Sequence, residues 1–436
     1  MAVSTLVIGF GVTGEAVARH ADAGTVVAVE DRPDDAKRER AAALGVTLVE
    51  APDEVALAAL VRKAELVLPS PGVPLSHPIY RVAEQSGAEV VSEVELAARR
   101  ARVPIVAITG TNGKTTVTTL VAAMLVASGS RAVAAGNIGL PLLDAVASDA
   151  EVIVAEVSSF QLAFTRTFAP HVATWLNLAE DHLDWHPSMR HYADAKARIW
   201  ANQTPGDIAV ANRDDPAVMA AAATAPAAVV TFGGGEGDYR VSNGFLVAPA
   251  GNQIAALDEL PRRLPHDIAN ALAATASAIS AGATMASCRR TLLGFEGLPH
   301  RVTLVREAGG IRYFDDSKAT TPASVLAALE GFESAVLIAG GMNKGLDLGV
   351  LATAASHIRA VVAIGDAAPA VEAAFRGLRP VTRAGSMTQA VMQAKEAACQ
   401  GDAVLLSPGC ASFDWYSSYA ERGDDFVQAV RTLVEG

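Results

Sequence analysis

A short apolar run followed by a glycine-rich loop containing a lysine constrains the fold of this chain more than any other feature. Residues 105–108 form the run, and after Thr109 the chain continues with Gly110, Thr111, Asn112, Gly113, Lys114, Thr115 and Thr116. A buried strand, such a loop and a following Ala-rich helix form the setting in which backbone N–H groups cradle phosphates. The sequence therefore predicts an α/β domain with a phosphate-binding loop.

The loop supplies candidate residues for both phosphate and metal. Lys114 can reach the terminal phosphates of a nucleotide, and the hydroxyl of Thr115 or Thr116 can bind Mg²⁺. The spacing is a variant, because Ile108 stands where the common phosphate-loop pattern has its first glycine. A glycine-rich turn with an incidental lysine is the alternative, and the strand–loop–helix setting makes it the weaker one.

Length and charge exclude several classes of protein. The chain has 436 residues, and at roughly 100–200 residues per domain we expect three domains. Its formal net charge of −12 argues against a general nucleic-acid binder, which needs a basic surface to meet phosphates. An anionic small molecule is compatible with this charge, because a few local cationic side chains and backbone N–H groups suffice to bind it.

Three cysteines and one uncharged stretch bear on the location of the protein. Cys288, Cys399 and Cys410 match no zinc pattern, and a reducing cytosol fits them. The N-terminus lacks the basic region of a signal peptide. Residues 268–287 carry no charge but consist largely of Ala, Ser and Thr, so we expect a helix packed inside a domain and no membrane insertion. The expected location is cytoplasmic.

Short β-branched runs alternate with helical patterns along the chain, as in parallel α/β sheets. The expected strands are residues 5–8, 26–29, 66–68, 89–91, 105–108, 152–155, 172–176, 335–339, 360–364 and 403–406. Residues 239–257 contain the turn Ser242-Asn243-Gly244 and read as a small antiparallel appendage. Gly and Pro at 297–299 read as a linker, and a hairpin with the turn Gly309-Gly310 follows. The predicted domains are 1–93, 94–298 and 299–436.

Two further segments near the phosphate loop carry candidate catalytic residues. Glu156 ends the apolar run 152–155, where a carboxylate could hold Mg²⁺ directly or through water. His182 follows the run 172–176 and is expected in a loop facing the nucleotide. A zinc site pairing His182 with His186 on a helix is the alternative, but Pro187 follows at once and no third ligand is evident. Lys196 lies on a predicted helix, where the residues alone favour a solvated surface side chain.

The N-terminal segment Gly9-Phe10-Gly11-Val12-Thr13-Gly14, with Glu30-Asp31 after the second expected strand, matches the dinucleotide fingerprint. By itself this motif indicates an NAD-dependent dehydrogenase. Any diphosphate can lie on such a helix N-terminus, however, and a UDP group would also fit.

Three loops in the last third of the chain follow apolar runs. They are residues 314–322, 339–345 and 406–414, and they contain Lys318, Lys344 and Ser412. Open α/β sheets bind ligands at the carboxyl ends of their strands, so these residues could converge on an anionic amino acid. A capping Asp-Ser, a tight turn and a helix start are the alternative interpretations.

In their order along the chain these motifs resemble the muramyl-peptide ligases over the whole length. The resemblance rests on residues 110–116, 156–159, 177–182, Lys196, 266–270, 300–301, 316–320 and 407–412. The loop 9–14, the turn Ser70-Pro71-Gly72, the segment 136–139 and the segment 410–414 are most similar to the D-glutamate-adding branch. The Asp-Asn-Pro-Arg motif of the diaminopimelate- or lysine-adding branch is not found, and folylpolyglutamate synthases lack a counterpart of residues 1–93.

This resemblance implies an α/β protein of three domains: an N-terminal Rossmann-like parallel sheet, a central P-loop domain with a small β appendage, and a C-terminal Rossmann-like domain. It implies an ATP-dependent ligase that adds D-glutamate to UDP-N-acetylmuramoyl-L-alanine through an acyl-phosphate and a tetrahedral intermediate. ADP and phosphate are the other products, and the pathway is peptidoglycan precursor synthesis. The expected enzyme is a cytoplasmic monomer that uses two Mg²⁺ ions.

The resemblance also assigns roles to residues. The expected catalytic residues are Lys114, His182 and Lys196. In the family the lysine that matches Lys196 is carbamylated, so the resemblance replaces the interpretation of Lys196 as a solvated surface side chain. ATP is expected to contact the phosphate loop, Asn270, Arg301 and Asp316. The UDP substrate is expected to contact Gly11, Val12, Thr13, Gly14, Asp31, Arg32, Gly72 and Asn137. D-glutamate is expected to contact Thr320, Lys344, Ser412, Phe413 and Tyr419. The expected metal ligands are Thr115, Glu156, His182 and Lys196.

Other functions compete with this one. Another amino-acid ligase of the same family would keep the first two domains and differ in its amino acid. An NAD-dependent dehydrogenase explains Gly9–Gly14 and Glu30 but leaves the phosphate loop unexplained. A nucleotide-gated regulatory protein would have no need of Lys114, Glu156, His182 and Lys196 together.

Overall fold

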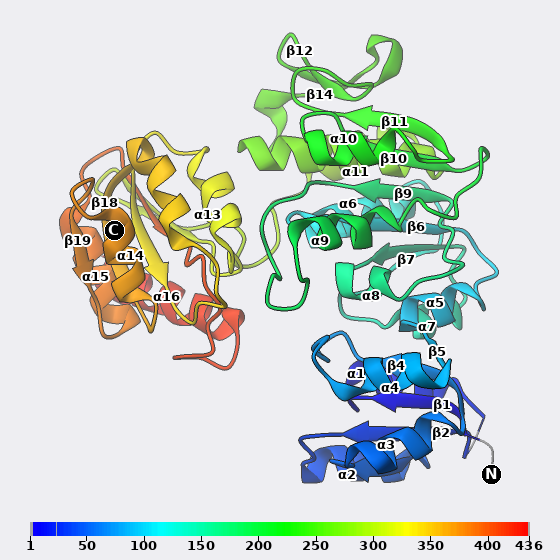
Figure 1. Ribbon diagram of the computed structural model, residues 1–436. Helices are drawn as coiled ribbons and strands as arrows, with labels where there is room; N and C mark the ends of the chain where they lie inside the picture. The colour runs from blue at the N-terminus through cyan, green and yellow to red at the C-terminus, as the bar shows by residue number, and fades with distance from the viewer. Residues whose placement is uncertain (1–2, 23, 435–436) are drawn as a thin grey trace. The chain divides into compact units, whose positions relative to one another are not determined.

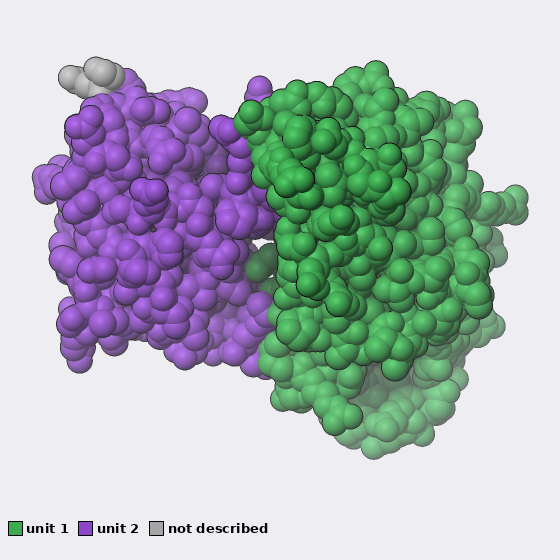
Figure 2. Space-filling model, turned by 90° about the horizontal axis from the view of Figure 1, so that it is seen from above, with its two compact units in different colours: residues 1–178, 185–259, 270–293 green, residues 179–184, 260–269, 294–436 purple. Residues whose placement is uncertain are grey.

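The computed structural model describes residues 3–22 and 24–434, which form two compact units (Figures 1 and 2). The first unit contains residues up to 178, residues 185–259 and residues 270–293. The second contains residues 179–184, residues 260–269 and the chain from 294 onward.

The first unit begins with a five-stranded parallel sheet in the order β3-β2-β1-β4-β5. Its strands are β1 Val3–Ile8, β2 Val26–Glu30, β3 Thr47–Glu50, β4 Ala64–Pro69 and β5 Glu89–Val90. Its helices are α1 Val12–Arg19, α2 Asp35–Ala43, α3 Glu54–Val61 and α4 Pro78–Ser86. Alternate residues of β1 enter different cores, Leu6 and Ile8 in one and Val7 in the other, so both faces of the sheet are covered.

A six-stranded parallel sheet in the order β11-β10-β9-β6-β8-β7 follows in the same unit. Its strands are β6 Ile105–Thr109, β7 Ala132–Gly136, β8 Val152–Glu156, β9 Val172–Trp175, β10 Ile208–Asn212 and β11 Ala228–Phe232. The strand order reverses at β6, and open α/β sheets bind ligands beyond the strand ends at such a point. The phosphate loop therefore occupies the position where a ligand is expected.

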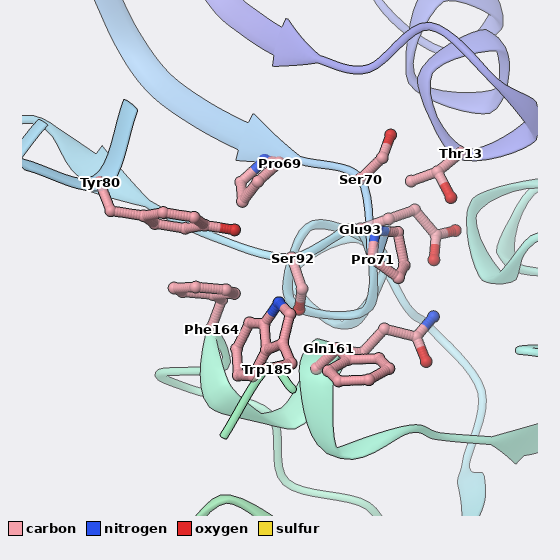
Figure 3. A pocket seen from close by; sticks show the side chains of 11 residues that line it. Thr13, Pro69, Ser70, Pro71, Tyr80, Ser92, Glu93, Gln161, Phe164 and Trp185 are labelled. Carbon is pink, nitrogen blue, oxygen red and sulfur yellow. The ribbon is translucent and has the colours of Figure 1, made fainter. Parts of the chain in front are cut away.

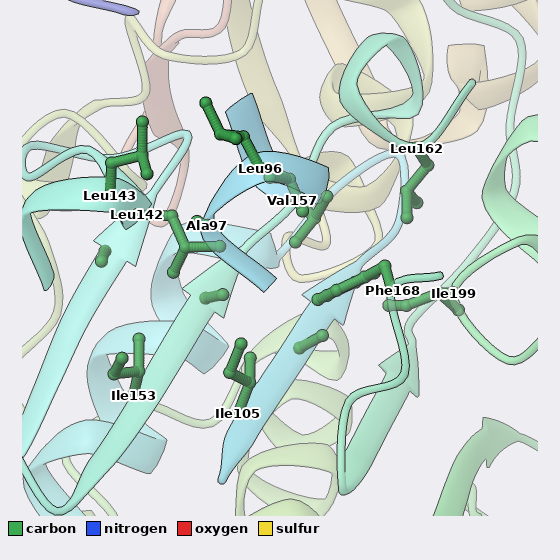
Figure 4. Packing of buried hydrophobic residues seen from close by; sticks show 14 of the residues in the cluster. Leu96, Ala97, Ile105, Leu142, Leu143, Ile153, Val157, Leu162, Phe168 and Ile199 are labelled. Atoms are coloured by element: carbon green, nitrogen blue, oxygen red, sulfur yellow. The ribbon is translucent and has the colours of Figure 1, made fainter. Parts of the chain in front are cut away.

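Helices surround this second sheet. They are α5 Glu93–Ala98, α6 Lys114–Ala127, α7 Leu142–Val146, α8 Ser159–Ala163, α9 Met189–Ala197, α10 Pro216–Ala222, α11 Pro265–Ser280 and α12 Met285–Leu293. Figure 4 shows one of the cores, in which side chains of β6 and β8 meet those of α5 and α7. Burial of these apolar side chains fixes the strand ends from which the candidate catalytic residues project.

The predicted antiparallel appendage and buried helix are both confirmed. The appendage consists of β12 Arg240–Ser242, β13 Phe245–Val247 and β14 Gln253–Ala256. Asn243 and Gly244 have φ of 50° and 79° at its turn, as a two-residue hairpin requires. In α11, residues 271–278 are buried. Across residues 3–22 and 24–434, no helix is both long and apolar enough to cross a membrane.

The second unit holds a six-stranded sheet in the order β15-β16-β20-β17-β18-β19. Its strands are β15 Thr303–Ala308, β16 Ile311–Asp315, β17 Ala335–Gly340, β18 Ile358–Ile364, β19 Val381–Arg383 and β20 Ala403–Leu406. Only the edge pair β15–β16 is antiparallel among its described pairings. Its helices are α13 Pro322–Leu329, the 3₁₀ segment Leu348–His357, α14 Ala368–Phe375, α15 Met387–Ala397 and α16 Tyr419–Leu433. The predicted α/β class is confirmed.

Candidate active site

The phosphate loop has the conformation that its glycines predict. It joins β6 to α6, and Gly113 is the N-cap of α6 with φ of 84°. A Cβ atom at Gly113 would lie 2.4 Å from Oδ1 of Asn270, which α11 carries. Both the backbone conformation and the close approach of Asn270 therefore require glycine at this position. The structure thus places Asn270, which was predicted to contact ATP, against the phosphate loop.

Asn177 fixes the shape of the phosphate loop, a role that the sequence motif did not reveal. Its Oδ1 accepts hydrogen bonds from the backbone N–H of Thr111 at 3.0 Å and of Asn112 at 2.8 Å. Its Nδ2 donates to the carbonyl oxygen of Asn112 at 3.2 Å. Nζ of Lys114 donates to the carbonyl oxygens of Gly110 and Thr111 at 2.9 and 2.7 Å. The loop and its lysine are therefore ordered by contacts within the first unit.

Lys196 is buried, so the interpretation of a solvated surface lysine is wrong. Its residue exposure is 1%, and its Nζ donates to the carbonyl oxygen of Gly110 at 2.7 Å. Nζ also lies 4.6 Å from the centre of the Tyr192 ring. Tyr192, one helical turn earlier on α9, contacts Oγ1 of Thr111 through its hydroxyl at 3.2 Å. One face of α9 thus brings Lys196 to the phosphate loop.

Glu156 combines burial with an oxygen atom that has no hydrogen-bond partner. It ends β8 and is 3% exposed, and its Oε1 accepts from Nδ2 of Asn137 at 2.9 Å. Within the described part of the chain, its buried Oε2 has no hydrogen-bond partner. An unpartnered buried carboxylate oxygen is costly unless a cation or donor arrives. The site therefore fits Mg²⁺, which prefers carboxylate and hydroxyl oxygens.

His182 lies in a loop, as predicted, and its φ of 56° is unusual for a residue other than glycine. Its Nε2 lies 3.2 Å from Oδ2 of Asp181. His182 belongs to the second unit, whereas Lys114, Glu156 and Lys196 belong to the first. No cluster of three or more His, Cys, Asp or Glu side chains that could hold a metal is found among the described residues.

The N-terminal loop lies at the start of α1, and its acidic residue Glu30 is bonded to the loop itself. A Cβ atom at Gly14 would lie 2.9 Å from Cγ1 of Val7, so glycine allows α1 to pack closely on β1. The carboxylate of Glu30 accepts from the backbone N–H of Phe10 at 2.9 Å and of Arg32 at 3.0 Å. These hydrogen bonds keep the buried Glu30 carboxylate directed toward the loop that contains Phe10. Glu30 is therefore poorly placed to bind a ribose hydroxyl, which weakens the dehydrogenase alternative.

The other residues predicted for the UDP substrate follow strands of both sheets of the first unit. Asp31 and Arg32 are exposed beyond β2, and Nε2 of His77 lies 3.0 Å from Oδ2 of Asp31. Gly11, Val12 and Thr13 lie at the start of α1, where Gly11 is an N-cap without a side-chain hydrogen bond. Asn137 follows β7.

Trp185 is a residue of this region that sequence reasoning missed. Thr13, Ser70 and Pro71 line a pocket together with Glu93, Gln161, Phe164 and Trp185 (Figure 3). Nε1 of Trp185 donates to the carbonyl oxygen of Val73 at 2.9 Å, and the Tyr80 hydroxyl donates to the same atom at 3.2 Å. Trp185 thereby ties the loop that contains Gly72 to the segment after His182.

The second unit contains the remaining candidates for ATP, Arg301 and Asp316. Burial raises the pKa of Asp316 to about 7, and the charge of Arg301 acts in the opposite direction. Oδ2 of Asp316 accepts from the Ser407 hydroxyl at 2.7 Å, and Oδ1 accepts from the backbone N–H of Val302 at 3.3 Å. Asp316 is therefore held rigidly at the end of β16.

The residues predicted for D-glutamate follow β16, β17 and β20 of the second unit. Nζ of Lys344 lies 5.9 Å from the centre of the Phe413 ring, and Phe413 is 59% exposed. Ser412 is buried, and Thr320 precedes α13. Tyr419 begins α16, and Nζ of Lys318 lies 3.8 Å above its ring. The structure thus brings these residues to the same edge of one sheet.

Three family models match the chain along its length. They are the MurD-like N-terminal domain of Mur ligases at residues 3–92, the Mur ligase middle domain at 108–278, and the Mur ligase glutamate ligase domain at 300–410.

Curated relatives match nearly the whole chain. A protein of Desulfosudis oleivorans named "UDP-N-acetylmuramoylalanine--D-glutamate ligase" is 41% identical over 99% of this chain and 96% of its own length. A protein of the same name from Frankia casuarinae is 43% identical over 98% of this chain and 93% of its own length.

Solved structures share the fold at low sequence identity. UDP-N-acetylmuramate-alanine ligase of Thermotoga maritima matches with a TM-score of 0.59 and 20% identity, over 98% of this chain and 99% of that chain. A pseudomurein peptide ligase type C of Methanothermus fervidus matches with a TM-score of 0.59 and 18% identity, over 92% and 96%.

Proposed function

The chain belongs to the Mur ligase family, and on that premise we propose that it joins D-glutamate to UDP-N-acetylmuramoyl-L-alanine at the expense of ATP. The full-length relatives at 41% and 43% identity carry this activity in their names. The MurD-like N-terminal domain model at residues 3–92 supports the same member of the family. The reaction makes a precursor of peptidoglycan.

The observation that best supports ATP chemistry is the arrangement around the phosphate loop. The loop Gly110–Gly113 is surrounded within one unit by Lys114, Asn270 and Lys196. Lys114 would contact the terminal phosphates of ATP, and its charge would stabilise negative charge that builds up during transfer. Asn177 pre-forms the loop, so little ordering is needed when ATP binds. Arg301 and Asp316 of the second unit would bind the remainder of ATP.

The substrate carboxylate is a poor electrophile and must first be activated. Its oxygen attacks the γ-phosphorus of ATP, ADP leaves, and an acyl-phosphate forms. The neutral amine of D-glutamate then attacks the acyl carbon, and the tetrahedral intermediate collapses to an amide and phosphate. The chain contributes mainly by positioning the reactants and excluding water. Gly11–Gly14, Gly72 and Asn137 would hold the UDP substrate, and Thr320, Lys344, Ser412, Phe413 and Tyr419 would hold D-glutamate.

We propose that Thr115, Glu156, His182 and a carbamylated Lys196 hold two Mg²⁺ ions. When bound, the Mg²⁺ ions would neutralise negative charge on the phosphate groups. Oε2 of Glu156, which has no hydrogen-bond partner among the described residues, supports this, and so does the burial of the Lys196 cation beside the phosphate loop. A carbamate on Lys196 would replace that cation with an anion suited to Mg²⁺.

The location and assembly of the enzyme follow from the same chemistry. We propose a cytoplasmic monomer, because one chain supplies every contact proposed here and its cysteines are free.

The proposed function is tested by incubating the purified protein with Mg²⁺, ATP and UDP-N-acetylmuramoyl-L-alanine, with and without D-glutamate. The expected result is continuous release of ADP and phosphate, with a product that has the mass of the amide, only when D-glutamate is present. Without D-glutamate, reduction by borohydride should trap the acyl-phosphate as an alcohol. ATP consumption that is independent of the UDP substrate would contradict the proposal.

A further inference from the structure

Arg422 is a buried charge that no step proposed above uses. It lies on α16, is 1% exposed, and belongs to the largest fully buried side chains of the protein. Burial lowers the pKa of its guanidinium to about 10. Among the described residues it forms no ion pair with a carboxylate within 4.0 Å. Burying a cation without a carboxylate partner costs desolvation free energy. The role of this side chain therefore lies in its hydrogen bonds.

All five N–H groups of Arg422 are occupied by two loops. Nε donates to Oγ of Ser317 at 3.0 Å, and Nη2 donates to the carbonyl oxygen of Ser317 at 2.8 Å. Both Nη atoms donate to the carbonyl oxygen of Cys410 at 3.1 Å, and Nη1 also donates to that of Ala411 at 3.2 Å. A guanidinium has five N–H donors in a fixed planar arrangement, so no other side chain can make this set of bonds.

A third loop lies against the same side chain. A Cβ atom at Gly341 would lie 3.1 Å from Nη1 of Arg422 and 2.4 Å from the carbonyl oxygen of Ala411. The backbone N–H of Met342 donates to that carbonyl oxygen at 2.9 Å, and the N–H of Ala411 donates back at 3.0 Å. Arg422 therefore contacts the loops that follow β16, β17 and β20.

These three loops carry the residues proposed to bind the amino acid. Ser317 precedes Thr320, Gly341 precedes Lys344, and Ala411 precedes Ser412. The Ser317 hydroxyl that accepts from Arg422 also donates to the carbonyl oxygen of Tyr419 at 2.7 Å. Arg422 itself is too buried to touch a ligand, so any effect on binding must act through the loops.

We propose that Arg422 is a positioning residue that sets the mutual spacing of the three loops and thereby the affinity for the amino-acid substrate. This inference rests on the proposed function, since it takes D-glutamate as that substrate. If Arg422 only filled space in the core, an apolar side chain of similar volume could replace it without loss of stability. A positioning residue acts on one substrate and depends on the guanidinium geometry.

The test compares Arg422→Lys, which keeps a charge but loses the planar arrangement, with Arg422→Ala supplied with guanidinium or urea at equal millimolar concentrations. In Arg422→Lys the KM for D-glutamate should rise about tenfold, as expected for the loss of one or two hydrogen bonds. The KM for UDP-N-acetylmuramoyl-L-alanine should stay within about twofold, as the first unit binds it. The KM for ATP should change less than that for D-glutamate, because Ser407 and Val302 hold Asp316 independently.

Chemical rescue separates positioning from mere stability. Guanidinium should restore part of the D-glutamate affinity of Arg422→Ala, whereas urea, which is neutral, should not. Arg359→Lys is the matched control, since the exposed Arg359 pairs with Asp402 in the same unit and away from the three loops, and its kinetics should equal those of the wild type. An unchanged KM for D-glutamate in Arg422→Lys, or equal changes in every KM, would overturn the inference.

If neither Arg422 variant folds, Ser317→Ala decides, because it removes one acceptor and keeps the arginine. Its KM for D-glutamate should rise by a smaller factor, and an unchanged value would overturn the inference. The wild type is measured first. A wild type inactive with D-glutamate refutes the proposed function, whereas an active wild type with normal Arg422→Lys kinetics refutes only the role of Arg422.

Discussion

Nζ of Lys196 donates a hydrogen bond to the carbonyl oxygen of Gly110 over 2.7 Å, although the two residues are 86 positions apart. This bond joins α9 to the first residue of the phosphate loop. It brings the amine of a lysine far along the chain to the phosphate loop, as the proposed role of Lys196 in phosphate chemistry requires.

Lys196→Ala should therefore lower kcat by about a hundredfold or more, a loss typical of removing a group that orients a metal site. Lys196→Arg should fail equally, since a guanidinium cannot form a carbamate. The wild type grown or incubated with ¹³C-bicarbonate should show a carbamate carbon by NMR, and Lys196→Ala should not. Full activity in Lys196→Arg would contradict the carbamate.

Glu156→Gln should raise the Mg²⁺ concentration that gives half-maximal activity. The amide keeps the size of the side chain but removes the charge that attracts the cation. We expect an increase of about tenfold or more, measured by titrating Mg²⁺ at saturating ATP. Glu151→Gln is the control, because Glu151 precedes the opposite end of β8 and is exposed. An equal Mg²⁺ requirement in both variants would exclude Glu156 as a ligand.

Trp185→Phe should weaken binding of the UDP substrate and leave the KM for ATP unchanged. Phenylalanine retains an aromatic ring in the pocket of Figure 3 but cannot donate to Val73. Loss of one hydrogen bond predicts a rise of about three- to tenfold in that KM. Tyr80→Phe, which removes the longer of the two bonds to Val73, should have a smaller effect in the same direction. A change confined to the KM for ATP would refute this role.

Asp316 should make the second unit less stable as the pH rises. Burial raises its pKa to about 7, whereas an unfolded Asp titrates near about 3.9. The folded state thus binds more protons between these values, and its stability falls across that window, by about 1.4 kcal/mol for each pKa unit. Asp316→Asn abolishes this titration.

The difference in unfolding free energy, wild type minus Asp316→Asn, should decline from about pH 4 to about pH 7 and then level off. Urea denaturation followed by fluorescence of Trp415, the tryptophan of the second unit, measures this difference. A difference that is constant with pH would show that Asp316 ionises normally.

Local sequence patterns predicted the strands that carry the chemistry because these strands are buried on both faces. Residues 105–108, 152–155 and 403–406 are apolar throughout, and each forms a strand with those residues. The strands β7, β10, β11 and β19 were missed, and so were two elements between residues 44 and 64. β3 Thr47–Glu50 is a half-exposed strand of the sheet, and α3 Glu54–Val61 has little segregation of its apolar residues.

The environment of single side chains could not be predicted from local pattern. The residues around Lys196 indicated a surface position, and only the packing of α9 against the phosphate loop buries it. No role was assigned to Asn177, Trp185 or Arg422, because their partners lie far from them in the chain or on other loops. Their roles depend on tertiary contacts, which the periodicity of a sequence does not encode. The domain boundaries and ligand assignments remain predictions.

The most direct test of the account is phosphate release and product mass with UDP-N-acetylmuramoyl-L-alanine, ATP and Mg²⁺ when D-glutamate, L-glutamate, L-lysine, diaminopimelate and L-alanine are offered in parallel. The proposed function predicts phosphate and an amide product with D-glutamate alone. Turnover with a different amino acid instead would contradict the assignment of D-glutamate and move the enzyme to another branch of its family. No turnover with any of them, despite ATP binding, would contradict the nucleotide-sugar substrate itself.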